Sequence, residues 1–294
     1  MRKTSSIAVL TVALLAPAAA AQEYTVKLGK PGPGDQAQVK TDNSFDVEFK
    51  LLDAGGQVVM EKKEAKSHAF AFREVAVERG PAGSDLVKLK RTYKKAQRTV
   101  DGDRRALIFQ GETVAIEKKG DAFQFQIDGG ETIEGEDAKE LHEEFNKGAV
   151  ARLFELFLPK KAVKIDETWT YDVGLLVKEF MKDGKIEIDA AKSTGAGKLV
   201  KAYQKNGKQF GVLELTITMP VTALINDDNK TPTKEGKLVI KLEQDTAIDG
   251  SLDQSQMKMT FDGDIKGAIT ANGMDFGVEV TIRGKVEQSR VPGK

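Results

Sequence analysis

The feature that most constrains this chain is a regular alternation of apolar and polar residues through its last third. In "MKMTFDGDIKGAI" every second residue is apolar or glycine, and most of the others are charged or carry a hydroxyl group. The apolar members are Met257, Met259, Phe261, Ile265 and Ile269. A period of two is typical of a β-strand with one buried side. The run from Met274 through Phe276 to Ile282 repeats the pattern after the turn signal Asn272-Gly273, so the two runs predict an antiparallel hairpin.

The same alternation occurs upstream, in residues 213–219 and 238–242. Together these runs predict a C-terminal meander of about five long strands from Leu199 onward. Pro220 interrupts one run, which indicates a bulge or an edge position, because proline cannot donate to a strand ladder.

The N-terminal part also consists of short alternating runs, separated by turn signals at hairpin spacing. The expected strands are 23–28, 44–52, 57–63, 67–77, 86–93, 106–109, 113–118 and 122–127.

Helical spacing of apolar residues is confined to the middle of the chain. It predicts short helices over 137–147, 149–157 and 173–182, the second ending at Pro159. The predicted fold class is therefore mainly β, within α+β: a large curved antiparallel sheet, or sheets, made of long meander strands, with two or three short helices in the middle of the chain.

The N-terminus has the three parts of a secretory signal peptide: Arg2 and Lys3, the apolar run "IAVLTVALLA", and a small-residue stretch. The run is shorter than the roughly 20 residues of a membrane span. We predict a signal peptide at 1–21 and a single exported β-rich domain at 22–294, with sub-blocks 22–158 and 159–294. The mature protein is expected to be periplasmic or extracellular, with no transmembrane anchor.

Composition narrows the chemistry. The chain has no cysteine, which excludes disulfides and thiolate metal sites. The whole chain has 45 basic and 45 acidic residues, and removal of Arg2 and Lys3 leaves 43 against 45, a formal charge of −2. Because the signs are balanced and interspersed, nothing favours nucleic acid as a partner.

No catalytic or metal-binding motif is complete. "HEEFN" at 142–146 has the first half of a zinc-protease motif, but Asn146 occupies the position of the second histidine. "SQMK" at 255–258 matches a serine-enzyme string that needs a helix, whereas this run alternates as a strand. We therefore expect no metal, no cofactor and no enzymatic activity.

The only tryptophan, Trp169, and Tyr171 share one face of a short expected strand after Pro159. An amphipathic aromatic pair of this kind either anchors helix against sheet or forms an exposed platform for a ligand. The sequence favours the anchor and leaves the platform open.

The apolar face of the C-terminal runs is the stronger candidate for binding. It combines Met257, Met259, Phe261 and Phe276 with glycines at the same parity. Methionine fills irregular cores and also lines adaptable binding surfaces. We take these four residues, with Trp169 and Tyr171, as candidate ligand-lining residues on a concave sheet face.

Three functions follow from these observations. The leading hypothesis is a non-enzymatic exported protein of the cell envelope that binds an apolar or lipid-like small molecule on the concave face. The alternative is a solid-core structural or interaction module that binds an envelope protein through a strand edge. The third is a hydrolase using carboxylates near Glu167.

The stretches "TYKKAQRTVDG", "GETVAIEKKGD" and "LPKKAVKIDETWTYD", with the closing meander, resemble uncharacterised exported bacterial β-rich proteins of unknown function. In architecture the chain also resembles the periplasmic lipoprotein-carrier fold, by analogy of fold alone. That second resemblance implies a large curved antiparallel sheet, closed by helices over an apolar cavity.

Overall fold

A computed structural model describes residues 22–80, 86–145, 154–181, 184–226, 229–271 and 274–293. The chain is mainly β and forms a 13-stranded antiparallel sheet that does not close, together with a small two-stranded sheet. The predicted fold class is therefore confirmed. The predicted signal peptide, 1–21, lies outside the described residues.

The strands of the N-terminal part are β1 (Glu23–Tyr24), β2 (Gln36–Leu52), β3 (Val58–Arg79), β4 (Leu86–Val100), β5 (Asp103–Ala106), β6 (Thr113–Lys119) and β7 (Ala122–Ile127). Those of the middle are β8 (Val163–Lys164), β9 (Thr168–Thr170) and β10 (Ile186–Ile188). The five long strands of the predicted meander are β11 (Thr194–Lys205), β12 (Lys208–Asn226), β13 (Asn229–Ala247), β14 (Ser255–Ala271) and β15 (Met274–Pro292).

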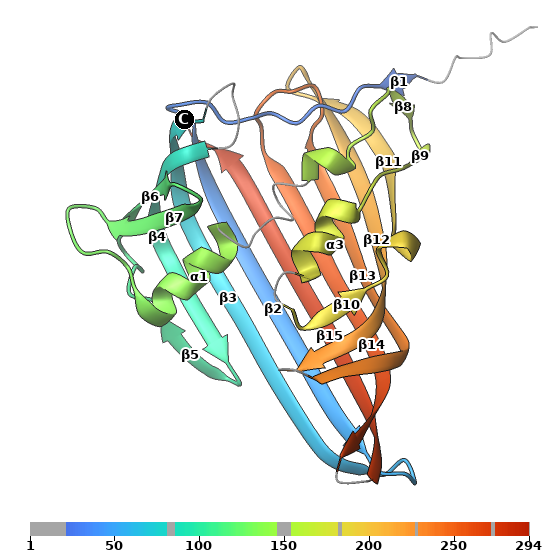
Figure 1. The fold of residues 1–294 in the computed structure, drawn as a ribbon. Coiled ribbons are helices and arrows are strands. Elements are labelled where there is room, and N and C mark those ends of the chain that lie inside the picture. Colours follow the sequence, from blue (N-terminus) through green and yellow to red (C-terminus); the bar gives the residue numbers. More distant parts are fainter. Residues whose placement is uncertain are drawn as a thin grey trace, which may run out of the picture.

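The strand order is β7-β6-β4-β3-β2-β15-β14-β13-β12-β11-β9, with β5 beside β4 and β10 beside β12. The pairing of β15 with β2 joins the two predicted sub-blocks in one sheet, in an unbroken register from Gly277–Leu52 to Pro292–Ala37. Figure 1 shows β2, β3, β14 and β15 side by side as the long middle of this sheet.

Two of the expected N-terminal strands, 57–63 and 67–77, are one strand, β3. The charged stretch between them does not turn, because its side chains are paired along and across the strands: Lys63 contacts Glu48 and Glu61, and Lys66 contacts Glu64.

The expected strand 106–109 is wrong beyond Ala106. The backbone of Leu107 donates to Ala96 O and then turns, so that the side chains of Leu107 and Phe109 enter the core.

Pro220 lies at a shift of register between β12 and β13, as the predicted bulge requires, and β12 is not an edge of the sheet.

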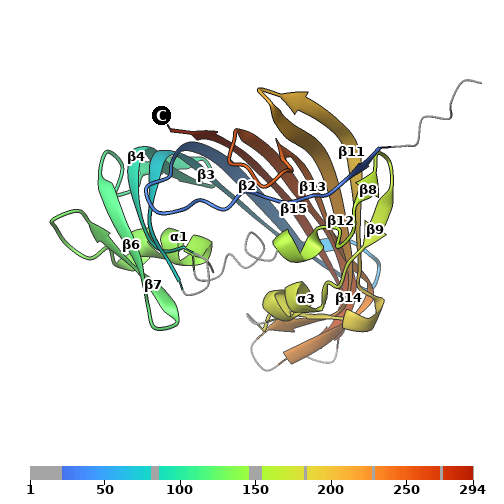
Figure 2. The ribbon, with the colours of Figure 1, turned by 90° about the horizontal axis from the view of Figure 1, so that it is seen from above.

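Two α-helices and two 3-10 helices lie in the described residues: α1 (Gly135–Phe145), η2 (Phe154–Phe157), α3 (Gly174–Met181) and η3 (Ala190–Lys192). The helices expected at 137–147 and 173–182 thus correspond to α1 and α3. Of the one expected at 149–157, residues 149–153 lie outside the described residues and the rest is η2. The sheet is curved, with α1 beneath one limb of the arch and α3 beneath the other (Figure 2).

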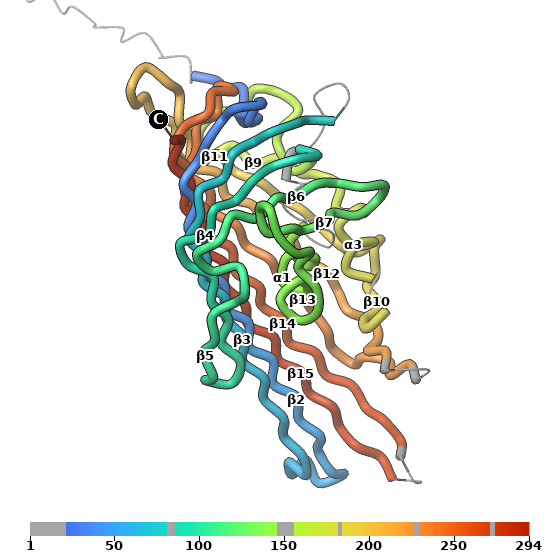
Figure 3. The backbone as a smooth tube through the Cα atoms, turned by 90° about the vertical axis from the view of Figure 1, so that its left-hand side faces the viewer, coloured from blue at the N-terminus to red at the C-terminus, as the bar shows by residue number. Residues whose placement is uncertain are grey.

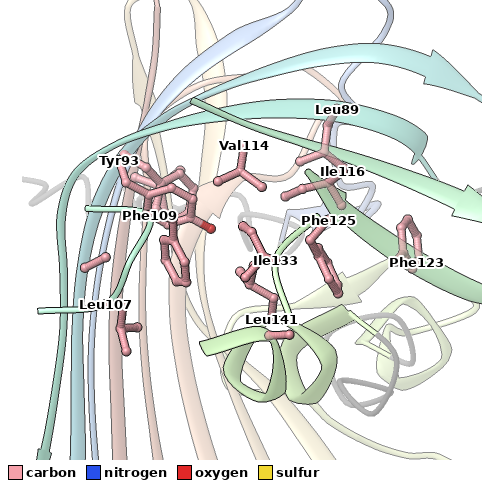
Figure 4. Packing of buried hydrophobic residues seen from close by; sticks show 14 of the residues in the cluster. Leu89, Tyr93, Leu107, Phe109, Val114, Ile116, Phe123, Phe125, Ile133 and Leu141 are labelled. Atoms are coloured by element: carbon pink, nitrogen blue, oxygen red, sulfur yellow. The ribbon is translucent and has the colours of Figure 1, made fainter. Parts of the chain in front are cut away.

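The core is divided among three clusters. Beneath the first limb, α1 contributes Ala138 and Leu141 to a cluster with Phe109, which lies between β5 and β6, and with Tyr93 and other residues of β2, β3, β4, β6 and β7 (Figure 4). Beneath the other limb, α3 contributes Leu176 and Val177 to a second cluster over β12, β13 and β14. A small third cluster lies by β1, β8 and β11. The helices therefore bury the concave face at its two ends.

Candidate functional site

The register places a continuous set of apolar residues on the concave face of the three middle strands. Met259 and Ile265 identify this face, because they belong to the cluster beneath α3. The residues of the same parity, matched across the ladders, form what we call the apolar strip: Met257, Met259, Phe261, Ile265 and Ile269 of β14, Phe276, Val278, Val280, Ile282 and Val286 of β15, and Phe45, Val47, Phe49 and Leu51 of β2.

Most of the strip remains partly exposed to solvent. Met259, Ile265 and Val278 are buried, the others are half-buried, and Phe45 is 41% exposed. Among the described residues, α3 shares a buried cluster with Met259 and Ile265 of β14, whereas no residue of β2 from Phe45 to Leu51 belongs to a cluster with a helix. The hairpins β2–β3 and β14–β15 extend past α1 and α3 at one end (Figure 3). The strip is therefore an apolar surface on the curved sheet that stays partly exposed along most of its length.

An aromatic pair crosses the strip near its upper end. Phe45 and Phe261 both face Gly284 in the ladders, and their ring centroids lie 5.9 Å apart. A Cβ atom on Gly284 would stand 2.6 Å from Cε2 of Phe45, so only glycine leaves room for this ring. Gly284 therefore leaves the space in which the Phe45 ring lies over β15.

The dimensions of the strip suit an extended chain molecule. From Asn43, just above it, to Leu51 the strand rises by about 27 Å, at about 3.4 Å per residue. Three strands span about 10 Å between the outer backbones, at about 4.8 Å per interval.

The upper end of the strip is polar. Thr41 and Asn43 of β2 continue the concave parity beyond Phe45, and Gln288 of β15 faces Thr41. Gln288 Nε2 donates to Thr41 Oγ1 at 3.3 Å. Oδ1 of Asn43 is buried and has no hydrogen-bond partner.

Ion pairs beside this polar end attach α1 to the sheet. Glu140 lies 2.9 Å from His68 Nε2 and 3.3 Å from Arg98 Nε, and Arg98 also binds Glu136 at 3.0 Å. Burial opposes ionisation of Glu140, but His68 and Arg98 outweigh it, and the pKa of that carboxyl is lowered. Carboxylates of α1 thus engage both His68 and Arg98.

A second, buried ionic cluster joins β3, β4, β15 and α1. Glu74 accepts from Arg91 Nε at 3.0 Å and from Arg290 Nη1 at 2.9 Å, and Arg91 Nη1 donates to Glu144 at 2.8 Å. The guanidinium also lies 4.2 Å from the centroid of the Phe72 ring. Burial raises the pKa of the adjacent Tyr93 to about 12. This cluster holds structure together and offers no open site.

Trp169 and Tyr171 lie away from the strip, packed between η2 and β11. Trp169 Nε1 donates to Phe157 O at 2.7 Å, and Tyr171 stacks on the Phe157 ring with centroids 4.8 Å apart. A Cβ on Gly197 would lie 2.4 Å from Trp169 Cε2. The pair has the contacts of an anchor, and burial raises the pKa of Tyr171 above its usual range.

Four of the six candidate residues, Met257, Met259, Phe261 and Phe276, therefore lie on one surface, and Trp169 and Tyr171 do not. Sequence reasoning missed the contribution of β2, from Phe45 to Leu51. The alternation in "SFDVEFKLL" carried the signal for a strand, but not for its pairing with β15.

Two hollows in the described surface lie elsewhere. One is lined by Tyr203, Phe210 and Asp245 among others, and the second lies against Lys40, Arg73 and Lys94, whose parity places them on the convex face. Neither includes a residue of the strip.

The carboxylate named in the hydrolase hypothesis takes part in a turn. Glu167 closes a turn by accepting from Lys164 N at 2.8 Å. No group of three or more potential ligands in the described residues could hold a metal ion, and no described helix is long and apolar enough to cross a membrane.

No family model matches the chain, and no curated protein matches it. A structure described as lipid–protein interactions in lipovitellin is similar with TM-score 0.37 and 10% identity, covering 90% of this chain and 25% of that chain. The chain thus spans about a quarter of lipovitellin. A TodX monoaromatic hydrocarbon channel mutant has TM-score 0.23 and 9% identity, covering 92% and 93%. Pseudomonas aeruginosa OpdQ has TM-score 0.18 and 8% identity, covering 88% and 98%. These scores are too low to assign a shared fold.

Proposed function

We propose that the protein is a non-enzymatic, exported component of the cell envelope that binds an apolar, lipid-like molecule along the apolar strip. The observation that supports this is the half-buried apolar surface on the concave side of β14, β15 and β2, which stays partly exposed along most of its length. Export rests on the signal peptide expected from the sequence.

We expect the strip to bind an apolar ligand because covering its exposed apolar surface removes that surface from water, which lowers the free energy. A contiguous apolar surface left in water is unusual in a soluble protein and marks a site that binds something. Each square ångström covered contributes about 25 cal/mol. The concave face favours a slender molecule lying along the strands, because such a ligand covers the strip over its length.

The first experiment is organic extraction and mass spectrometry of protein purified gently from its own envelope, against a mock purification. We expect a stoichiometric apolar molecule. An empty extract, with no uptake of added lipid, would contradict the proposal. That result would favour the alternative hypothesis, in which a protein partner binds by strand addition at β7 or β9, the two edge strands of the sheet.

Matched variants locate the site. Val47→Asp places a charge in the strip, whereas Val291→Asp places the same charge on a residue that is already 52% exposed near the end of β15. We expect the first to abolish ligand recovery and the second to leave it unchanged, with both proteins folded by circular dichroism. Screens with ester and glycoside substrates test the hydrolase hypothesis. We expect no turnover, and reproducible turnover of any substrate would support a hydrolase instead.

A further inference from the structure

One polar atom on the concave face is left without a partner. Among the described residues, the buried side-chain atoms that form no hydrogen bond are Asn43 Oδ1, His68 Nε2, Arg98 Nε, Asp137 Oδ1 and Ser251 Oγ.

Four of these five atoms have an electrostatic partner. His68 and Arg98 face Glu140 at 2.9 and 3.3 Å, and Asp137 faces Arg105 Nη1 at 3.3 Å. Ser251 interacts with Asp249 and helps to hold the pKa of that carboxyl low. Asn43 alone has none, and a buried amide oxygen without a partner calls for an explanation.

The position of Asn43 explains why its amide oxygen lacks a partner within the protein. It faces His68 of β3 on one side and Val286 of β15 on the other, and it follows Phe45 of the strip at the next inward position of β2. A molecule lying along the strip therefore brings one of its ends to this amide.

The chemistry of the neighbours limits what that end can be. The basic side chains nearest to this end of the strip are engaged by carboxylates: His68 and Arg98 by Glu140, Lys66 by Glu64, and Arg290 by Glu74. Among the described residues, an anionic head would find no uncompensated positive charge here, and a cationic head no uncompensated carboxylate. A carboxamide both donates and accepts, so a hydroxyl group satisfies it whichever way the amide is turned.

We propose that the ligand is a long-chain amphiphile with an uncharged, hydroxyl-bearing head. The head binds at Asn43, beside Thr41 and Gln288, and the chain lies along the strip towards the β2–β3 and β14–β15 hairpins. This inference rests on the proposed function and narrows it from any apolar molecule to one class, in one orientation.

Three probes with the same oleoyl chain test it: monooleoylglycerol, methyl oleate and oleate. Dissociation constants are measured on the full mature chain by displacement of a neutral fluorescent naphthylamine. We expect monooleoylglycerol to bind about tenfold more tightly than methyl oleate, equivalent to about 1.4 kcal/mol, and more tightly than oleate. Asn43→Leu, which keeps the size and removes both hydrogen-bonding groups, should bring monooleoylglycerol to the affinity of methyl oleate.

Two further variants control the comparison. Ser44→Ala removes a polar group from the next residue of β2, which faces the other side, and should leave all three affinities unchanged. Asn43→Thr keeps a hydroxyl group in a strand-favouring side chain, and should retain part of the preference even if Asn43→Leu does not fold.

The outcomes separate the two proposals. Equal binding of the three probes, or a preference that survives Asn43→Leu, overturns the head-group inference and leaves the apolar site standing. Tightest binding of oleate overturns the uncharged head. Failure of all three to displace the fluorophore refutes the proposed function and this inference with it.

Discussion

The buried ionic cluster around Glu74 gives the most demanding prediction. Its perturbation is Glu74→Gln, which preserves shape and removes one charge. The side chains of Glu74 and Arg91 are each only 8% exposed, so the substitution leaves a buried guanidinium short of one carboxylate. Breaking a buried pair from one side costs about 3–5 kcal/mol.

The structure indicates the lower end of that range. Arg91 keeps Glu144, whose side chain is 43% exposed and therefore partly screened by solvent, and Arg290 is 28% exposed and can turn to water. We expect a loss of about 3 kcal/mol in the free energy of unfolding. For a chain of this size that lowers Tm by about 6 °C, at about 2 °C per kcal/mol.

The pH dependence follows from the pKa of Glu74. Burial alone would raise this pKa, but Arg91 and Arg290 outweigh it and hold it below the ordinary value of 4.5. A depressed carboxyl pKa contributes stability above the unfolded value, and this contribution is lost as pH falls through the folded value. The difference between the wild-type protein and Glu74→Gln should therefore be full at neutral pH and shrink below pH 4.5.

The assay is urea unfolding followed by circular dichroism, repeated from neutral to acid pH. The double variant Glu74→Leu, Arg91→Met removes both charges and should recover most of the loss, because an apolar pair of similar volume needs no desolvation. The reasoning is refuted if Glu74→Gln unfolds within about 1 kcal/mol of the wild type, or if the difference persists unchanged in acid.

Two further predictions concern the C-terminal limb. Gly197→Ala should destabilise the protein by about 1–3 kcal/mol and shift Trp169 fluorescence to the red, because the added Cβ would lie 2.4 Å from the indole. The control is Gly130→Ala, where the atom nearest to the added Cβ is 3.7 Å away. An unshifted Trp169 spectrum in Gly197→Ala would contradict the role of Trp169 as an anchor. Burial and a 2.7 Å hydrogen bond to Asp245 raise the pKa of Tyr203 to about 12, so Asp245→Asn should lower that pKa in a spectrophotometric titration of tyrosinate, and an unchanged curve would count against the pairing.

Much of the fold could be predicted because strand periodicity is a local property. Met257 and Phe261 alternate with charged residues, and the hairpin pairing of β14 with β15 follows from that alternation and a turn signal. The long β3 could not be predicted, because the charged stretch near Lys63 reads as a break until Glu48 of the neighbouring strand is seen to pair with it.

The candidate site was predictable only in part, for the same reason. Met257, Met259, Phe261 and Phe276 were identified from their shared parity. Parity assigns a residue to a face, but not to the part of that face that the helices bury. Met259 is buried, whereas Phe45, on a strand distant in sequence, is 41% exposed on the same surface.

The sequence by itself determined that the chain forms long antiparallel strands with one apolar side, since the pattern that sets this lies within each strand. Only the tertiary structure decided that β2 pairs with β15, because a ladder between strands distant in sequence depends on how the two parts of the chain come together. That pairing creates the strip and brings Asn43, whose Oδ1 has no hydrogen-bond partner, to its end. The apolar character of the strip is set within each strand, whereas its extent across three strands depends on the pairing of β15 with β2.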